Sequence, residues 1–248
     1  MILHDTPPGL ILDNIRGEAE KVGFALRKQE RIARNEFMRL GPHKKIFVAD
    51  YTVPVSKNRY LLYLESVWNF PANIYPEIGH TGVILYTNGP KGHDYWVTGR
   101  MDVGNETISC LFQFTGHFLS RYRERSKIQV SKSPHELAAL YISRNLDIMV
   151  EQDFKKLNLN AEKYENGEAA QVQDGVVFFT KTTLRSPAGT PFLYFKMNTF
   201  VSLSTLKEPQ TENVNSYGEI ASYMSDKKFQ TKWAEHVNSI RTILTKKN

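Results

Sequence analysis

Five runs rich in β-branched and aromatic residues follow one another, and this succession constrains the fold more than any other feature of the sequence. The runs span residues 45–53, 59–70, 81–88, 94–103 and 106–114. Such residues favour strands, and most connectors between the runs are short and contain the Gly, Asn or Ser typical of tight turns. Because parallel strands need long crossovers, the pattern predicts a largely antiparallel sheet. The longer connector, residues 71–80, contains two prolines and a glycine and is predicted to be an irregular loop.

An amphipathic helix is predicted before the first strand. Apolar residues recur at helical intervals from Asp13 to Leu40, with basic side chains between them, and Gly41–Pro42 ends the pattern. Gly17 and Gly23 each weaken a helix by about 1 kcal/mol relative to Ala. A single helix, a bent helix and two shorter helices therefore stay open.

Two central helices are predicted after the fifth strand. One starts near Thr115. The other starts at Ser133, which can cap it, and Glu136 completes a capping box; its pattern continues to Leu157. Residues 159–173 are polar and are predicted to form a loop.

The remainder of the chain is predicted to form a hairpin and a C-terminal helix. Residues 174–184 and 190–202 have strand composition and are joined by a turn, and residues 216–244 give one or two helices. This order of elements is that of an α+β protein. With no repeat or convincing linker, residues 1–248 are predicted to form a single domain, with a subdivision near residue 130 as the alternative.

Composition excludes several classes of protein. Of 248 residues, 41% are hydrophobic and 23% charged, which is a globular balance. The single cysteine, Cys110, excludes an internal disulfide and a multi-cysteine zinc site and suits a reducing compartment. The N-terminus has no signal-peptide pattern and no run of 18 apolar residues occurs, so a cytoplasmic protein without membrane contact is expected.

Metal and nucleotide motifs are missing from the sequence. His80 and His93 flank a predicted strand, but there is no HExxH motif, no close His pair and no glycine-rich phosphate loop. We therefore expect neither a metal nor a cofactor.

The net charge of +6 is unevenly distributed. Positions 14–45 hold nine Lys and Arg against four Glu, and positions 115–132 hold five against one. Positions 133–175 hold four basic residues against eight acidic ones. The two basic segments fit a phosphate-rich or acidic partner, and solvated helix faces are the simpler alternative.

The stretch FTGHFLSRYRERSKI, residues 114–128, concentrates chemistry on one helix. His117, Arg121 and Arg125 recur at intervals of four and so share one polar side, whereas Phe118, Leu119 and Tyr122 can pack on a sheet. A histidine beside two arginines suits general acid–base cleavage of a phosphodiester, the arginines stabilising the added negative charge. A solvated side, or pairing of this side with the acidic segment 133–175, is the alternative.

The run HFLSRYRERSKI, an H-x3-R-x3-R pattern, resembles the helix of small bacterial toxin-like domains of the RelE/barnase-like ribonuclease class. The resemblance implies metal-independent RNA cleavage, in which the 2′-hydroxyl of the substrate is the nucleophile. The segment MNTFVSLSTLKEPQ looks like the last strand of such domains and nominates Thr199 or Ser202 as the supporting hydroxyl. This chain departs from the pattern because five predicted strands precede the helix.

The sequence therefore predicts an RNA-acting, toxin-like protein in which His117 is the general acid or base and Arg121 and Arg125 hold phosphate. Basic and aromatic residues also alternate at 59–60, 121–123 and 194–196, which is typical of surfaces that stack single-stranded bases. A non-catalytic interaction protein that docks an acidic partner or inhibitor is the alternative.

Overall fold

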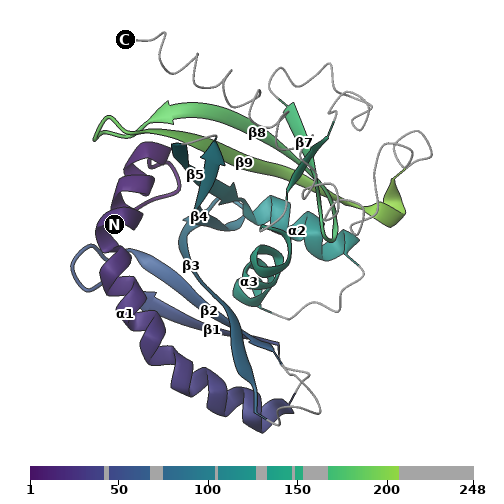
Figure 1. The fold of residues 1–248 in the computed structure, drawn as a ribbon. Coiled ribbons are helices and arrows are strands. Elements are labelled where there is room, and N and C mark those ends of the chain that lie inside the picture. Colours follow the sequence, from purple (N-terminus) through teal and green to yellow (C-terminus); the bar gives the residue numbers. More distant parts are fainter. Residues whose placement is uncertain are drawn as a thin grey trace.

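The computed structural model describes residues 1–41, 45–67, 75–103, 106–126, 133–146, 149–152 and 167–206. The described part of the chain is α+β with a mainly antiparallel sheet, as the sequence predicts (Figure 1). Its elements are α1 (Pro8–Leu40), β1 (Ile46–Thr52), β2 (Arg59–Val67), β3 (Glu77–Gly89), β4 (Gly92–Val103), β5 (Glu106–Phe114), α2 (Gly116–Arg125), α3 (Pro134–Asn145), β6 (Val150–Gln152), β7 (Gly167–Val172), β8 (Gly175–Arg185), β9 (Pro191–Ser202) and the short 3-10 helix η3 (Leu203–Thr205).

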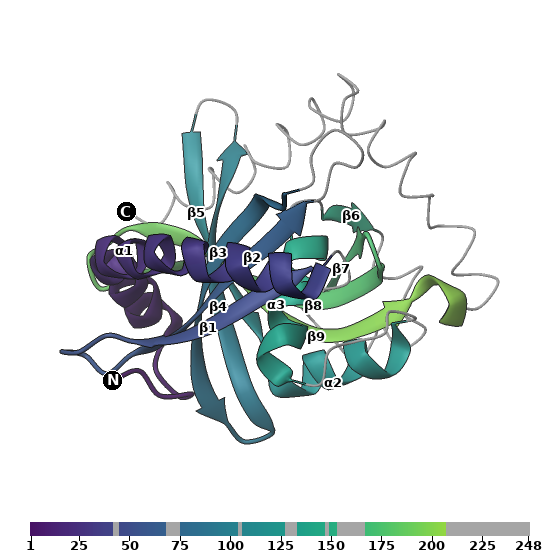
Figure 2. The ribbon, with the colours of Figure 1, turned by 90° about the horizontal axis from the view of Figure 1, so that it is seen from below.

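The described strands form one nine-stranded sheet in the order β1-β2-β3-β4-β5-β9-β8-β7-β6. Strands from both sides of residue 130 belong to it. Neighbouring strands are antiparallel except β5 and β9, which run parallel with Ser109 opposite Phe192. The two views in Figures 1 and 2 show a strongly twisted sheet, with β1–β3 turned away from β8 and β9.

The first helix is continuous from Pro8 to Leu40, so neither Gly17 nor Gly23 breaks it. It ends at Gly41, whose φ of 70° and ψ of −168° lie in a positive-φ region that glycine adopts without strain. Its buried apolar side packs on one face of the sheet. The residues of this contact are Ile11, Leu12, Val22 and Ala25 of α1 with Tyr60, Leu62, Leu85, Trp96 and Leu111 of the strands.

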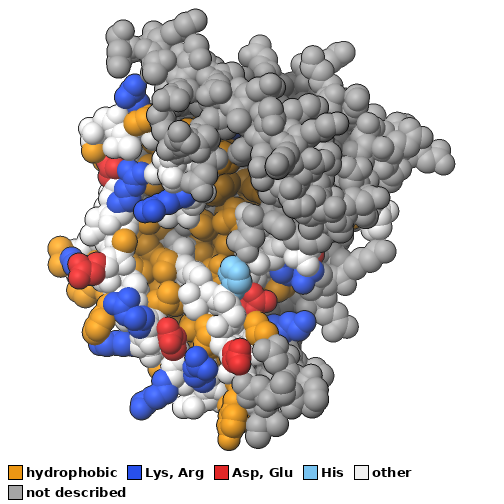
Figure 3. Space-filling model, in the orientation of Figure 1, with side chains coloured by type: hydrophobic (Ala, Val, Ile, Leu, Met, Phe, Trp, Pro, Cys, Tyr) orange, Lys and Arg blue, Asp and Glu red, His pale blue; other side chains and the backbone are white. Residues whose placement is uncertain are grey.

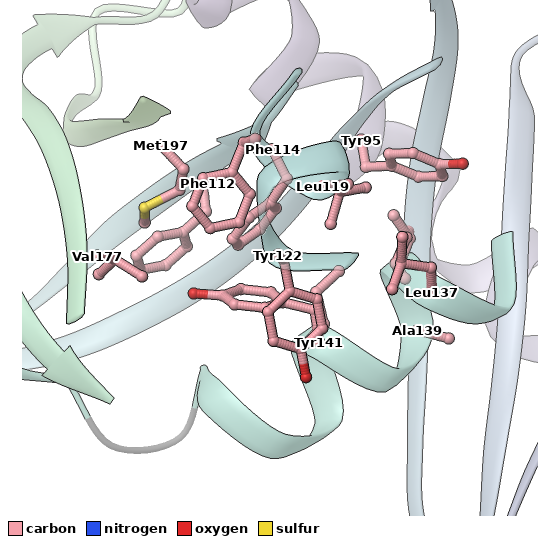
Figure 4. Packing of buried hydrophobic residues seen from close by; sticks show 14 of the residues in the cluster. Tyr95, Phe112, Phe114, Leu119, Tyr122, Leu137, Ala139, Tyr141, Val177 and Met197 are labelled. Atoms are coloured by element: carbon pink, nitrogen blue, oxygen red, sulfur yellow. The ribbon is translucent and has the colours of Figure 1, made fainter. Parts of the chain in front are cut away.

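The opposite face of the sheet is covered by α2 and α3. Their aromatic side chains meet edge to face, with the rings of Tyr122 and Tyr141 4.8 Å apart and those of Tyr122 and Phe200 5.0 Å apart. Figure 4 shows Tyr122 and Tyr141 beside Phe114 in this cluster. Tyr122 and Phe200 are completely buried, so this face holds the main core.

Three predicted boundaries were wrong. The third helix ends at Asn145 rather than Leu157, since Val150–Gln152, predicted to continue it, form β6 and pair with β7. The predicted loop 159–173 contains β7, in which Gln171 is fully buried and pairs with Val176. The third strand begins at Glu77, inside the predicted loop 71–80.

The C-terminal helix predicted at 216–244 lies outside the described residues. Among the helices that the structure describes, α1 included, none is apolar over the length needed to cross a membrane.

Candidate functional site

The second helix is held in one orientation by its ends and its inner side. The hydroxyl of Thr115 caps it by accepting a hydrogen bond from Phe118 N at 3.2 Å. Phe118, Leu119 and Tyr122 are buried, as the wheel predicts. The polar side of the helix is therefore presented outward on a rigid element.

The three predicted site residues of α2 have different surroundings. His117 is exposed and has no hydrogen-bond partner within the described residues. Arg121 pairs with Glu124 at 2.8 Å, and this hydrogen bond holds the pKa of the Glu124 carboxyl below its ordinary value. Arg125 donates from Nη1 to Phe200 O at 2.6 Å, which ties the end of α2 to β9.

Neither of the two predicted hydroxyls is available to the outer side of α2. Thr199 pairs with Phe178 across β8 and β9, and paired residues project from the same face. Phe178 belongs to the small cluster with Ala169 and Val176, on the face opposite to α2. Ser202 is buried and hydrogen-bonded to Ser204 and Thr205. The structure thus does not bring the five predicted residues into one site.

A buried carboxylate fixes both central helices to the β7–β8 turn. Asp174 accepts hydrogen bonds from Tyr122 Oη at 2.7 Å, Arg144 Nη2 at 2.6 Å and Asn145 Nδ2 at 2.9 Å. Burial alone would raise the pKa of Asp174, but these hydrogen bonds outweigh it and lower the pKa. The network keeps α2 and α3 in place and leaves no oxygen of this carboxylate for a ligand.

A stack of planar groups lies on the same side of the sheet as α2 and α3. The Arg59 guanidinium lies 4.7 Å from the centre of the Tyr86 ring. The centre of that ring lies 4.5 Å from the centre of the His135 ring, with the two planes inclined by 57°, so this contact is tilted rather than stacked. His135 in turn stacks on His93, with ring centres 5.0 Å apart and planes inclined by 25°. We call these four residues, from β2, β3, α3 and β4, the ring stack.

Hydrogen bonds fix the chemistry of the ring stack. Tyr95 Oη lies 3.0 Å from His135 Nδ1, and His135 Nε2 lies 3.6 Å from Asp50 Oδ1. Tyr86 donates to the same Asp50 oxygen at 2.8 Å.

The protonation states follow from burial. Burial lowers the pKa of His135, with the Asp50 charge opposing the shift, and raises that of Tyr86 to about 12. The His135 ring is therefore neutral near pH 7, with its Nδ1 within hydrogen-bond distance of the Tyr95 hydroxyl. Because Tyr95 is only 1% exposed, its hydroxyl does not meet a substrate.

The ring stack lies beside the start of α2. Gly116 packs so closely on the β3–β4 turn that an added Cβ atom would lie 2.2 Å from Lys91 O and 3.3 Å from His93 O. Burial raises the pKa of the neighbouring Tyr95, and the positive charge of Arg123 on α2 opposes that rise. The first turn of α2 and the ring stack are thus neighbours on this side of the sheet.

Sequence analysis missed most of this region. Asp50, Tyr95 and His135 lie on three elements far apart in the chain, and no motif joins them. The basic–aromatic pair at 59–60 was the one signal of this region in the sequence. Arg59 belongs to the ring stack. Tyr60 points to the opposite face, toward α1, and donates a hydrogen bond to Glu18 at 2.6 Å.

Among the described residues, no group of three or more His, Cys, Asp or Glu side chains could hold a metal ion. Comparisons with protein-family models, with curated proteins and with solved structures find no match to this chain.

Proposed function

We propose that the protein binds single-stranded RNA on the region formed by the outer side of α2 and the ring stack. The observation that carries the proposal is the contact of Gly116 with the backbone of Lys91 and His93. Through this contact, the first turn of the arginine-rich helix α2 lies directly beside the planar side chains of the ring stack. Proteins that bind single strands combine these two features, since basic groups follow the phosphates and planar groups stack on bases.

The phosphate contacts come from the outer side of α2. Arg121 is partly exposed beside Glu124, and Arg123 is exposed at the other edge of the solvent-facing surface of α2, about 200° around the helix from Arg121. Arg123 and Arg125 lie in the last turn, where positive charge also favours the helix. Three arginines against one glutamate leave a net positive charge on this ten-residue helix.

The base contacts come from the ring stack. Tyr86 is buried, so the rings open to a base are those of His93 and His135, which are partly exposed. His135 is held by Tyr95 and loses little conformational freedom when a base stacks on it. Asp50 is exposed and its carboxylate can accept a hydrogen bond from the amino group of a base. Cationic groups, planar rings and a carboxylate acceptor together suit the phosphate and the base of a nucleotide, whereas a purely acidic peptide would use only the cationic groups.

The geometry supports binding without cleavage. Arg125 is engaged by Phe200 O, Thr199 lies on the opposite face, and Ser202 is held by its own turn. Among the described residues, Arg121 is therefore the one predicted partner that shares the exposed side of α2 with His117 and is not tied to β9. We infer that the described residues recognise RNA, and that toxin-like cleavage by His117 is not needed for this role.

Fluorescence anisotropy with a labelled single-stranded RNA, measured over a range of salt concentrations, tests the proposal. Arg123→Ala is expected to weaken binding and to reduce the salt slope by about one unit. His135→Ala, which removes a neutral ring, is expected to weaken binding by about 1–3 kcal/mol with an unchanged slope. Arg31→Ala, an exposed arginine of α1 on the other side of the sheet, is the matched control and should bind normally.

Several outcomes would overturn the proposal. Failure of the unmutated protein to bind RNA at low salt removes it, as does equal binding by the Arg123→Ala and Arg31→Ala variants. Stronger binding to polyglutamate than to RNA supports an acidic protein partner instead. RNA cleavage that disappears in His117→Ala would show that the protein is a ribonuclease rather than a binding protein.

A further inference from the structure

A pocket of about 470 Å³ lies on the α1 side of the sheet, away from the proposed RNA-binding region. One wall is α1 and the other is formed by β4 and the start of β5. Figure 3 shows hydrophobic side chains in a hollow next to α1, with Lys and Arg side chains at its edge. The volume lies within the range of small-molecule sites, about 300–1,000 Å³.

The pocket exists because side chains become small where helix and sheet meet. Trp96 and Leu111 fill the space between α1 and the strands at one end of the contact. Thr98, two residues after Trp96 in β4, and Ser109, two residues before Leu111 in β5, occupy the same face, because alternate strand residues project to one side. Ala19 faces them from the helix, so the space stays open.

The lining has two chemical halves. Leu12, Ile15 and Ala19 share one side of α1 and give an apolar wall. The other half carries the guanidinium groups of Arg16 and Arg100 and the hydroxyls of Thr98 and Ser109.

The charged residues of the lining favour an anionic ligand. The described lining residues include two arginines and no carboxylate. Arg16 donates to Ser109 Oγ at 2.5 Å and lies 4.0 Å from Asp13, an exposed and weak pairing. Arg100 is exposed and makes no hydrogen bond or ion pair within the described residues. Two arginines beside a pair of hydroxyl donors suit an oxyanion.

We propose that this pocket binds a medium-chain organic carboxylate. The carboxylate group accepts hydrogen bonds from Arg16 and Arg100, and the hydrocarbon chain lies along Leu12, Ile15 and Ala19. The apolar wall distinguishes such a ligand from a small inorganic anion, and the arginines distinguish it from a neutral amphiphile.

Isothermal titration calorimetry of the full chain with decanoate, acetate and decanol tests the proposal. Decanoate is expected to bind, and acetate and decanol to bind at least about tenfold more weakly, since each lacks one half of the match. Arg100→Ala is expected to weaken decanoate binding about tenfold or more. Ala19→Phe, at an exposed helix position, is expected to abolish binding by filling the pocket.

Lys21→Ala is the matched control because Lys21 is an exposed cation on the same helix outside the pocket. The proposal fails if decanoate does not bind at millimolar concentration, if decanol binds as well as decanoate, or if Arg100→Ala and Ala19→Phe both bind decanoate normally. The RNA anisotropy of these variants should equal that of the unmutated protein, so this proposal and the RNA proposal can fail separately.

Discussion

Removal of the Asp174 carboxylate is expected to destabilise the fold by about 2–4 kcal/mol. The Asp174 side chain is 8% exposed and accepts from Tyr122, a fully buried residue. An Asp174→Ala variant leaves the Tyr122 hydroxyl without its acceptor, which costs about 1–3 kcal/mol. Arg144 is 32% exposed and regains water, so its lost ion pair adds only about 1 kcal/mol.

Urea denaturation followed by circular dichroism measures this effect, and a double-mutant cycle isolates its cause. Tyr122→Phe alone is expected to cost about 1 kcal/mol. In the Asp174→Ala background the same change should be neutral or stabilising, because it removes the hydroxyl that has lost its acceptor. Glu124→Gln breaks an ion pair on the exposed side of α2 and should leave the unfolding midpoint unchanged.

The reasoning is refuted if Asp174→Ala costs less than about 1 kcal/mol, or if Tyr122→Phe has the same effect in both backgrounds. Acid provides a second check. The folded-state pKa of Asp174 is lowered, so its contribution is present above its ordinary pKa of about 4 and is lost as the pH falls further. The difference in stability between the unmutated protein and Asp174→Ala should therefore shrink below about pH 4.

Three further predictions concern the ring stack, the start of α2 and the buried thiol. The pKa of His135 is lowered in the folded state, so the free energy of unfolding should fall as the pH drops below about 6.5. In urea titrations at several pH values, His135→Phe should show a shallower fall. An equal dependence of the unfolding free energy on pH in both proteins would contradict this. Gly116→Ala should destabilise by about 1–3 kcal/mol, since its Cβ would meet Lys91 O, whereas the control Gly17→Ala, with open space around it, should stabilise by up to about 1 kcal/mol in thermal unfolding. Burial raises the pKa of Cys110 to about 12, so mass spectrometry should find it alkylated by iodoacetamide at pH 8 only after unfolding; rapid labelling of the native protein would show an accessible thiol.

Local pattern was sufficient for much of the fold. The first five strands and the β8–β9 hairpin follow from runs of β-branched and aromatic residues, and the α+β class follows from their order. The starts of α2 and α3 follow from Thr115 and Ser133, whose side chains cap them. The single-domain organisation of residues 1–248 stays a prediction.

Long-range pairing decided what local pattern could not. The segment containing Gln171 is polar enough to predict a loop, yet pairing with β8 makes it a strand and buries that amide. The parallel alignment of β5 with β9 likewise depends on segments about eighty residues apart in the chain.

In the candidate site, too, local pattern determined some features and tertiary structure determined others. The sequence by itself determined that His117, Arg121 and Arg125 occupy the outer side of one amphipathic helix, because helical periodicity fixes which residues share a side. Only the tertiary structure decided that Arg125 holds Phe200 O and that His135 stacks on His93. Periodicity sets the direction of a side chain, but its partner depends on which distant strand or helix the folded chain places beside it.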